Sequence, residues 1–249
     1  GVEAFAEAAG LPWRDLVVTA VEDVEFLAPF KFYKDEPRTV TVEARFLPDG
    51  DGLVAECRLL GSRILPTSPD PVVTTHFTGR VLLRSERADL GDRPIPVDAA
   101  GVGADDLYEV YFHGPTYQVL DHARRNGDEV AGLLATDLPP NHQPGSGSTV
   151  TAPRLLELCF QTAGAFEIGT TGTMALPTRI GRVEYGSGPL DDGDPVTAVV
   201  VATDDGFTAE VVGESGIVMR LTGYATVQLP GGLDEVAVEP IRMAMGRDG

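Results

Sequence analysis

The sequence predicts an α+β protein in which antiparallel strands outnumber helices. Most of the chain consists of short segments of alternating polarity that are separated by turn residues such as Gly, Asp and Pro. Only one long stretch, residues 152–168, has convincing helical character. A shorter helical pattern at residues 1–9 precedes the first group of strands, so each half of the chain combines one helix with a set of strands.

The first half begins with the shorter helical pattern and continues as strands. Residues 1–9 place apolar side chains on one face but have no N-cap, so we expect the end of a helix that starts upstream of this sequence. A hairpin turn is predicted at residues 48–52. The strands are expected to form a four-strand meander over residues 16–32, 40–46, 53–60 and 72–83.

The two halves are separated by a stretch rich in Pro, Asp, Gly and Ala at residues 85–106. We therefore predict a first domain over residues 1–90, a linker over residues 91–106 and a second domain over residues 107–249. The second domain begins with a short amphipathic segment and contains the long helix. Its strands are expected over residues 119–121, 129–136, 178–185, 195–203, 208–214 and 218–228.

The composition excludes several classes of protein. The 249 residues carry 38 acidic side chains against 19 Lys and Arg, and this excess of negative charge argues against binding to nucleic acid or to anionic membranes. No apolar run approaches the ~20 residues of a membrane span, and the N-terminus does not read as a signal peptide. Cys57 and Cys159 lie in apolar patterns and are expected to be buried free thiols, which fits the cytoplasm. No histidine has the spacing of a zinc ligand, so no metal site is expected.

Two segments of the second half carry the candidate chemistry. The first reads Tyr-Phe-His-Gly-Pro-Thr-Tyr-Gln at residues 111–118, and the second, residues 152–164, is a mostly apolar helix with one carboxylate, Glu157. Gln161 follows four positions later, so both polar groups lie on one face of the helix, one turn apart. A carboxylate on an apolar helix is costly to bury unless it is used. The alternative, a solvated carboxylate on the helix surface, is disfavoured by the apolar neighbours.

Together these segments resemble the second half of the dehydratase domains of polyketide and polyunsaturated-fatty-acid synthases. Those domains carry a Gly-Pro-x-aromatic-Gln element and then a helix with an Asp followed four residues later by Gln or His; here Glu157 stands where Asp is usual. The resemblance extends over nearly the whole chain. It implies a double hotdog fold, in which two antiparallel sheets each wrap a central helix. It also implies a lyase that removes water from a 3-hydroxyacyl thioester on an acyl carrier protein, within a polyketide or fatty-acid synthase.

The resemblance assigns roles to individual residues. In this family a histidine removes the C2 proton and an Asp or Glu protonates the departing hydroxyl, so Glu157 is the expected acid and Gln161 orients it or the hydroxyl. Burial on an apolar helix favours the protonated carboxyl that this role needs. By default the aromatic residues of the first segment would be core side chains, and a place in the pocket wall is about equally expected. The residues expected to bind substrate are Tyr111, His113, Gly114, Pro115 and Tyr117.

The family's catalytic histidine belongs to an H-x-x-x-G-x-x-x-x-P motif that has no counterpart in this sequence. We therefore expect the base to lie upstream, and the chain alone to be nearly inactive, because a general acid or base contributes ~10²–10⁴ to the rate. Of the other histidines, His76 is expected to be structural, while His122 and His142 are expected to be solvated.

The resemblance implies no cofactor other than the phosphopantetheine arm that carries the substrate. The expected partners are the acyl carrier protein and neighbouring synthase domains, and a homodimer is an open alternative. Two other functions are open as well: a hotdog enzyme of another kind, such as a product-template cyclase or a thioesterase, and a non-catalytic dehydratase-like scaffold. The pairing of the Gly114-Pro115 element with the Glu157 helix favours the dehydratase.

Overall fold

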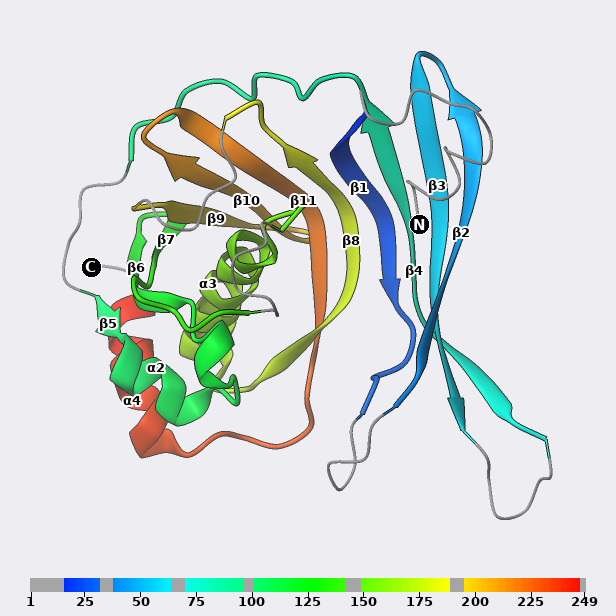
Figure 1. Cartoon of the computed structure of the whole chain (residues 1–249). Helices are drawn as coiled ribbons and strands as arrows, with labels where there is room; N and C mark the ends of the chain where they lie inside the picture. The colour runs from blue at the N-terminus through cyan, green and yellow to red at the C-terminus, as the bar shows by residue number, and fades with distance from the viewer. Residues whose placement is uncertain are drawn as a thin grey trace.

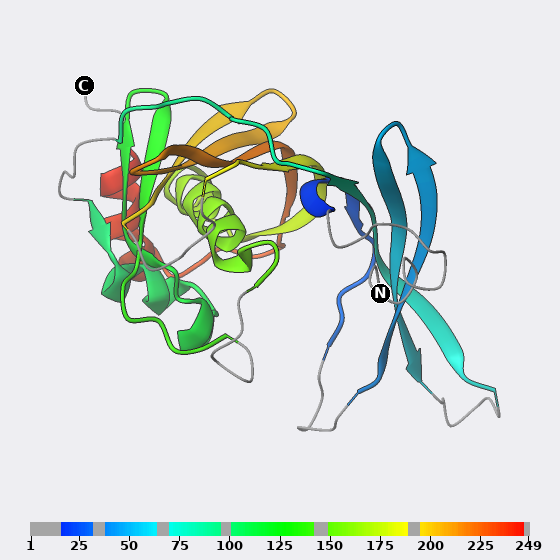
Figure 2. The ribbon, with the colours of Figure 1, turned by 45° about the horizontal axis from the view of Figure 1, so that its top comes forward.

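The computed structural model describes residues 16–31, 38–63, 70–95, 101–141, 149–188 and 195–246. Within these residues, eleven strands form one antiparallel sheet in the order β2-β3-β4-β1-β8-β11-β10-β9-β7-β6-β5. In the second half the sheet curls around one long helix, α3, which confirms the predicted α+β hotdog arrangement (Figures 1 and 2). The helix expected at residues 1–9 and the predicted solvation of His142 lie outside the described residues.

The expected four-strand meander of the first half is wrong in its order. The strands are β1 (Val17–Phe26), β2 (Val40–Asp49), β3 (Gly52–Arg63) and β4 (Val72–Arg84). Strand β1 pairs with β4 on one side and with β8 (Ala175–Tyr185) on the other, so it joins the two halves into one sheet. Alternating polarity identifies strands and the hairpin turn pairs β2 with β3, but neither pattern selects the partners of β1, because these are distant in sequence.

The second half contains the other elements that build the site. Its remaining strands and helices are β5 (Val102–Gly103), α2 (Ala104–Val110), the 3₁₀ helix η2 (Pro115–Tyr117), β6 (Leu120–Asn126), β7 (Glu129–Leu134), α3 (Pro153–Thr171), β9 (Thr197–Thr203), β10 (Gly206–Gly213), β11 (Gly216–Gln228) and α4 (Glu235–Met245).

Helix α3 is the long helix that the sequence predicts. Pro153 occupies its first turn, where a proline loses no helical hydrogen bond, and Gly172 ends it in the left-handed region at φ 70°. The N–H of Gly172 donates to the carbonyl of Ile168 at 2.8 Å. Strands and α4 surround the helix, so apolar side chains on several of its faces are fully buried: Leu155, Leu158, Ala163, Ala165 and Ile168.

A second helix of the core, α4, departs from the expectation of a single long helix. Asp234 caps it by accepting from the amides of Val236 and Ala237 at 2.9 and 3.2 Å. Pro240 lies inside the helix, which obscures its helical pattern in the sequence. Met245 packs so closely against α3 that a Cβ atom on Gly169 would lie 2.6 Å from the Cβ atom of Met245.

The predicted linker at residues 91–106 contains β5 and the start of α2, and its described part is anchored. Arg93 forms ion pairs with Glu129 at 2.6 Å and with Glu210 at 2.8 Å. The carbonyl of Gly91 accepts from the amide of Ile217 at 3.0 Å. The described part of this segment therefore lies along the second half and is held there by ion pairs and a backbone hydrogen bond (Figure 2). The division into domains at residues 90 and 106 stays a prediction.

Neither cysteine forms a disulfide, and Cys159 is buried in the core while Cys57 is partly exposed. Burial raises the pKa of Cys159 to about 12, so its thiol stays protonated. Within the described part of the chain, every helix falls short of the length and apolar character that crossing a bilayer requires.

Candidate active site

Helix α3 presents Glu157 and Gln161 side by side, as their spacing predicts. The Nε2 atom of Gln161 donates to Oε1 of Glu157 at 2.9 Å. Gln161 is only 2% exposed, whereas the side chain of Glu157 retains 22% exposure. The amide is therefore part of the core, and the carboxyl group is the member of the pair that a ligand can reach.

Three tyrosines fix Gln161 in place. The hydroxyl of Tyr108 donates to Oε1 of Gln161 at 2.7 Å, and Nε2 of Gln161 also donates to the carbonyl of Tyr117 at 2.8 Å. The hydroxyl of Tyr111 donates to the backbone carbonyl of Gln161 at 2.6 Å. Both ends of the amide are thus engaged, which sets its orientation and points one N–H at Glu157.

The tyrosine hydroxyls act as donors because they stay protonated. Burial raises the pKa of Tyr108 above its usual range and that of Tyr111 well above it, since a phenolate would lose its hydration, and the nearby charge of Glu157 adds to both shifts. Tyr108 was not among the predicted site residues. Its place in a short amphipathic segment gave no sign that it reaches α3.

His113 contacts the same carboxyl group. Its Nε2 atom lies 3.1 Å from Oε1 of Glu157. The ring stacks on Phe112 with centroids 4.9 Å apart and meets Tyr111 edge-on at 5.3 Å. Its Nδ1 atom is buried and has no hydrogen-bond partner among the described residues. The sequence placed His113 in the pocket, but not against the acid.

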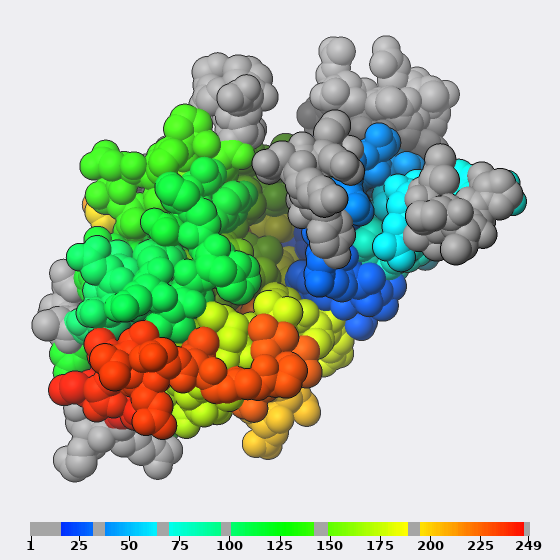
Figure 3. All heavy atoms as spheres, turned by 90° about the horizontal axis from the view of Figure 1, so that it is seen from below, coloured from blue at the N-terminus to red at the C-terminus, as the bar shows by residue number. Residues whose placement is uncertain are grey.

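The Gly114-Pro115 element holds His113 at this position. Pro115 opens η2, and the amide of Tyr117 donates to the carbonyl of Gly114 at 2.9 Å. The Nε2 atom of Gln118 donates to the carbonyl of His113 at 3.0 Å. The turn therefore brings Tyr117 and His113 against α3 from the same side. Figure 3 shows the surface hollowed between the green segment around α2 and η2 and the blue first half.

The five residues predicted to bind substrate are brought together around Glu157, but in different ways. Tyr111 is 8% exposed and its hydroxyl is engaged, which is the geometry of a core aromatic. Tyr117 contacts Gln161 through its backbone carbonyl. Phe112, for which a core position and a place in the pocket wall were about equally expected, is 71% exposed and stacks on His113.

The arrangement distinguishes the two oxygens of Glu157. Oε1 accepts a hydrogen bond from Gln161 and lies 3.1 Å from Nε2 of His113, while no hydrogen bond from the described residues reaches Oε2. A carboxylic acid can donate its proton from one oxygen while the other accepts hydrogen bonds. The geometry therefore suits proton transfer through Oε2.

A second carboxyl group on α3, Glu167, was missed by the sequence analysis. Its Oε1 atom accepts from the hydroxyl of Thr226 on β11 at 2.6 Å, and its Oε2 atom is buried without a partner among the described residues. Burial raises the pKa of Glu167, and the bond from Thr226 opposes the shift.

The fold and the site together define a hotdog protein of the dehydratase type. The family model of the polyketide synthase dehydratase N-terminal domain matches residues 85–235, which is more than half of the chain and contains the whole candidate site. The chain belongs to the polyketide synthase dehydratase family.

Solved structures share this fold at low sequence identity. The dehydratase domain from the CurF module of curacin polyketide synthase is 16% identical, with a TM-score of 0.61 over 85% of this chain and 76% of that one. The dehydratase domain of RzxB from Pseudomonas fluorescens is 14% identical, with a TM-score of 0.60 over 91% and 81%. An inactive aspartate-to-asparagine mutant of the CurK dehydratase is 15% identical, with a TM-score of 0.60 over 86% and 77%. A search of curated proteins finds no match.

Proposed function

We propose that this chain dehydrates 3-hydroxyacyl thioesters that an acyl carrier protein delivers within a polyketide or fatty-acid synthase. The observation that carries the proposal is the carboxyl group of Glu157, which is in contact with Gln161 and His113 at Oε1 and open at Oε2. Membership of the polyketide synthase dehydratase family supports the same reaction.

Glu157 acts as the general acid. A base removes the proton from C2 of the acyl chain, the bond between C3 and its oxygen breaks, and Oε2 of Glu157 gives its proton to the departing hydroxyl, which leaves as water. The electron pair of the C2–H bond becomes the double bond of the 2-enoyl thioester. Gln161 holds the carboxyl group at the angle that this transfer requires.

The base in this proposal is a histidine of the family's H-x-x-x-G-x-x-x-x-P motif, which has no counterpart among the 249 residues. Inactive mutants of the CurK dehydratase support a pair of catalytic groups, because one replaces a histidine by phenylalanine and the other an aspartate by asparagine. In this chain the longer Glu157 takes the part of that aspartate.

The substrate arm enters beside the turn at Gly114 and Pro115. His113 and Tyr117 line its path, and Tyr111 supports this wall from behind through its bond to α3. The reaction transfers protons and releases water without an external oxidant or reductant, so it needs no cofactor beyond the phosphopantetheine arm. The partners are the carrier protein and the neighbouring synthase domains, with a homodimer as a further possibility, and the unpaired cysteines fit a cytoplasmic synthase.

The test compares two carboxyl groups on the same helix. In the synthase module that includes the histidine motif, Glu157→Gln should lower dehydration of a carrier-bound 3-hydroxyacyl substrate by at least ~10²-fold. The matched control, Glu167→Gln, removes a carboxylate from the other part of α3 and should leave the rate within a few-fold. Equal rates for Glu157→Gln and the unaltered module would remove Glu157 from the mechanism, whereas an unaltered module that does not dehydrate the substrate would favour a scaffold.

A further inference from the structure

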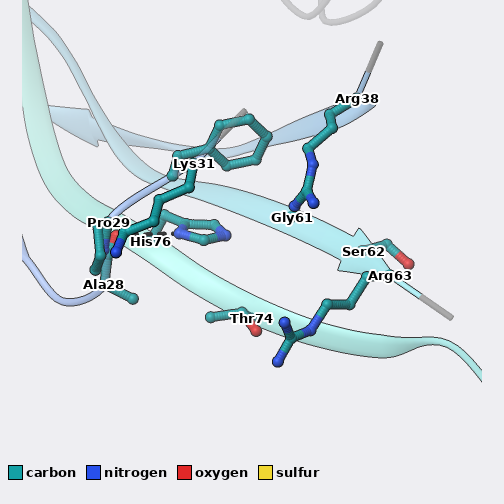
Figure 4. Close-up of a pocket in the computed structure, with 10 residues that line it drawn as sticks. Ala28, Pro29, Lys31, Arg38, Gly61, Ser62, Arg63, Thr74 and His76 are labelled. Carbon is teal, nitrogen blue, oxygen red and sulfur yellow. Dashed lines mark hydrogen bonds between the residues drawn. The ribbon is translucent and has the colours of Figure 1, made fainter. Parts of the chain in front are cut away.

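A pocket lies in the first half, where β1 and β3 end and β4 begins. Its volume is about 300 Å³, and Figure 4 shows its described lining. The strand ends that form it point to the same side of the molecule as α2 and η2 in Figure 1. The lining residues are Ala28, Pro29, Phe30, Lys31, Arg38, Gly61, Ser62, Arg63, Thr74 and His76.

The charge of this pocket is opposite to that of the chain. Lys31, Arg38 and Arg63 line it, and none of its described lining residues is acidic, although the chain has a net charge of −19. In the view of Figure 4, the ring of His76 lies between Lys31 on one side and the two arginines on the other. Like charges gathered around one cavity repel each other, and a bound anion would remove that cost.

Several other arginines on the same sheet have acidic partners. Arg58, for example, pairs with Glu43 at 2.6 Å, and Arg80 pairs with Glu22 at 3.3 Å. By contrast, Lys31 and Arg63 form no ion pair with any described residue. Their charges are therefore available to a ligand.

The floor of the pocket is built by close packing. The Nδ1 atom of His76 donates to the carbonyl of Ala28 at 3.0 Å, and its ring meets Phe30 edge-on at 4.8 Å. A Cβ atom on Gly61 would lie 2.5 Å from Nε2 of His76 and 3.0 Å from the Phe30 ring, so a glycine leaves the room that the imidazole needs. The bond at Nδ1 leaves Nε2 as the ring atom that has no protein partner among the described residues.

We propose that this pocket binds the phosphate group of a phosphate ester. The guanidinium fork matches phosphate oxygens in geometry, and an ammonium adds a point charge. The hydroxyls of Ser62 and Thr74 add neutral donors to the same lining. The identity of the ligand rests on the proposed function: we assign the phosphate to the phosphodiester of the carrier's pantetheine arm. A free phosphate ester has the same chemistry.

The test measures binding, not turnover. In calorimetric titrations of this chain, 4′-phosphopantetheine should bind about tenfold more tightly than pantetheine, and inorganic phosphate should compete with it. Lys31→Gln with Arg63→Gln should abolish the preference, whereas Arg45→Gln, at an arginine paired with Glu56 on β2 and β3, should retain it. Equal binding of the two ligands, or a preference that survives the double substitution, would overturn the site.

Two forms of the carrier protein distinguish the pantetheine arm from a free phosphate ester as the ligand. Holo-carrier should bind more tightly than carrier that lacks the arm, by a factor that the double substitution removes. Equal binding of the two carriers, with phosphate binding retained, would overturn the assignment to the arm and leave a site for free phosphate esters. Glu157→Gln should not change these affinities. The binding result at this pocket can therefore be interpreted even if Glu157 has no part in catalysis.

Discussion

The Nε2 atom of His113 lies 3.1 Å from Oε1 of Glu157, the oxygen that also accepts from Gln161. The contact is a consequence of the turn at Gly114 and Pro115, which brings a residue of the segment after α2 against the N-terminal part of α3. The bond from Gln161 and the contact with His113 both fall on Oε1, so they act together on the orientation of the carboxyl group. Under the proposed function, His113 is therefore a positioning residue for Glu157.

His113→Phe should therefore lower the dehydration rate by up to about tenfold, because it removes the ring nitrogen that contacts Oε1 and a hydrogen bond between neutral groups contributes ~0.5–1.5 kcal/mol. His113→Tyr should retain more of the rate, since a phenol can donate a hydrogen bond to Oε1. The measurement is kcat for a carrier-bound 3-hydroxyacyl substrate in the module with the histidine motif. If both variants match the unaltered module, the contact has no part in catalysis.

Gln161→Ala should cost less in rate than Glu157→Gln, because the amide orients the acid and transfers no proton. It should also lower the free energy of unfolding by roughly 1–3 kcal/mol, since the Tyr108 hydroxyl and the Tyr117 carbonyl would lose a partner in the core. Urea denaturation followed by tryptophan or far-ultraviolet signals measures this change. Tyr108→Phe, which removes one of these bonds, should show a smaller loss of stability, and an unchanged midpoint for Gln161→Ala would contradict the network.

Local patterns were enough to predict most strands, α3 and the pairing of Glu157 with Gln161. Strand periodicity and the spacing of four residues in a helix depend only on neighbours in the sequence, so they can be recognised without knowing the tertiary contacts. The partners of β1 were not predictable in this way, because β4 and β8 meet it across long stretches of chain. Helix α4 escaped detection because Pro240 interrupts its pattern, and its stability comes from packing on α3.

The site residues that the sequence missed are those that act across elements. Tyr108 reaches Gln161 from α2, and Glu167 meets Thr226 on β11. Each looks ordinary in its own segment, and only the curl of the sheet around α3 gives it a partner. The same holds for His113, whose place near the substrate followed from the resemblance but whose contact with Glu157 did not.

Substitution by alanine should destabilise the protein at one glycine near the site and have little effect at another. On β7, a Cβ atom at Gly132 would overlap the hydroxyl of the buried Thr162 and lie 2.8 Å from Leu120, so Gly132→Ala should lower the free energy of unfolding by ~1–3 kcal/mol. Gly114 has a φ of −72° and open space around its Cβ position, so Gly114→Ala should leave stability within about 0.5 kcal/mol. Denaturant midpoints of the two variants, measured side by side, check this. An equal loss for both would show that Gly114 is needed for a reason other than the space around its Cβ position.

Glu167 should make stability depend on pH in a defined direction. Its pKa is raised in the folded protein by burial, with an opposing bond from Thr226, so the folded state binds the proton more tightly than the unfolded chain does. Its contribution to stability is then fully present below the ordinary value of 4.5 and is lost as the pH rises through the raised pKa. Glu167→Gln cannot ionise, so the difference in unfolding free energy between the variant and the unaltered chain should shift in favour of the variant between pH 4 and pH 8. Urea titrations across that range measure this difference in unfolding free energy, and the substitution Glu239→Gln at an exposed site is the control. A difference that stays constant with pH would show that Glu167 is hydrated in the folded protein.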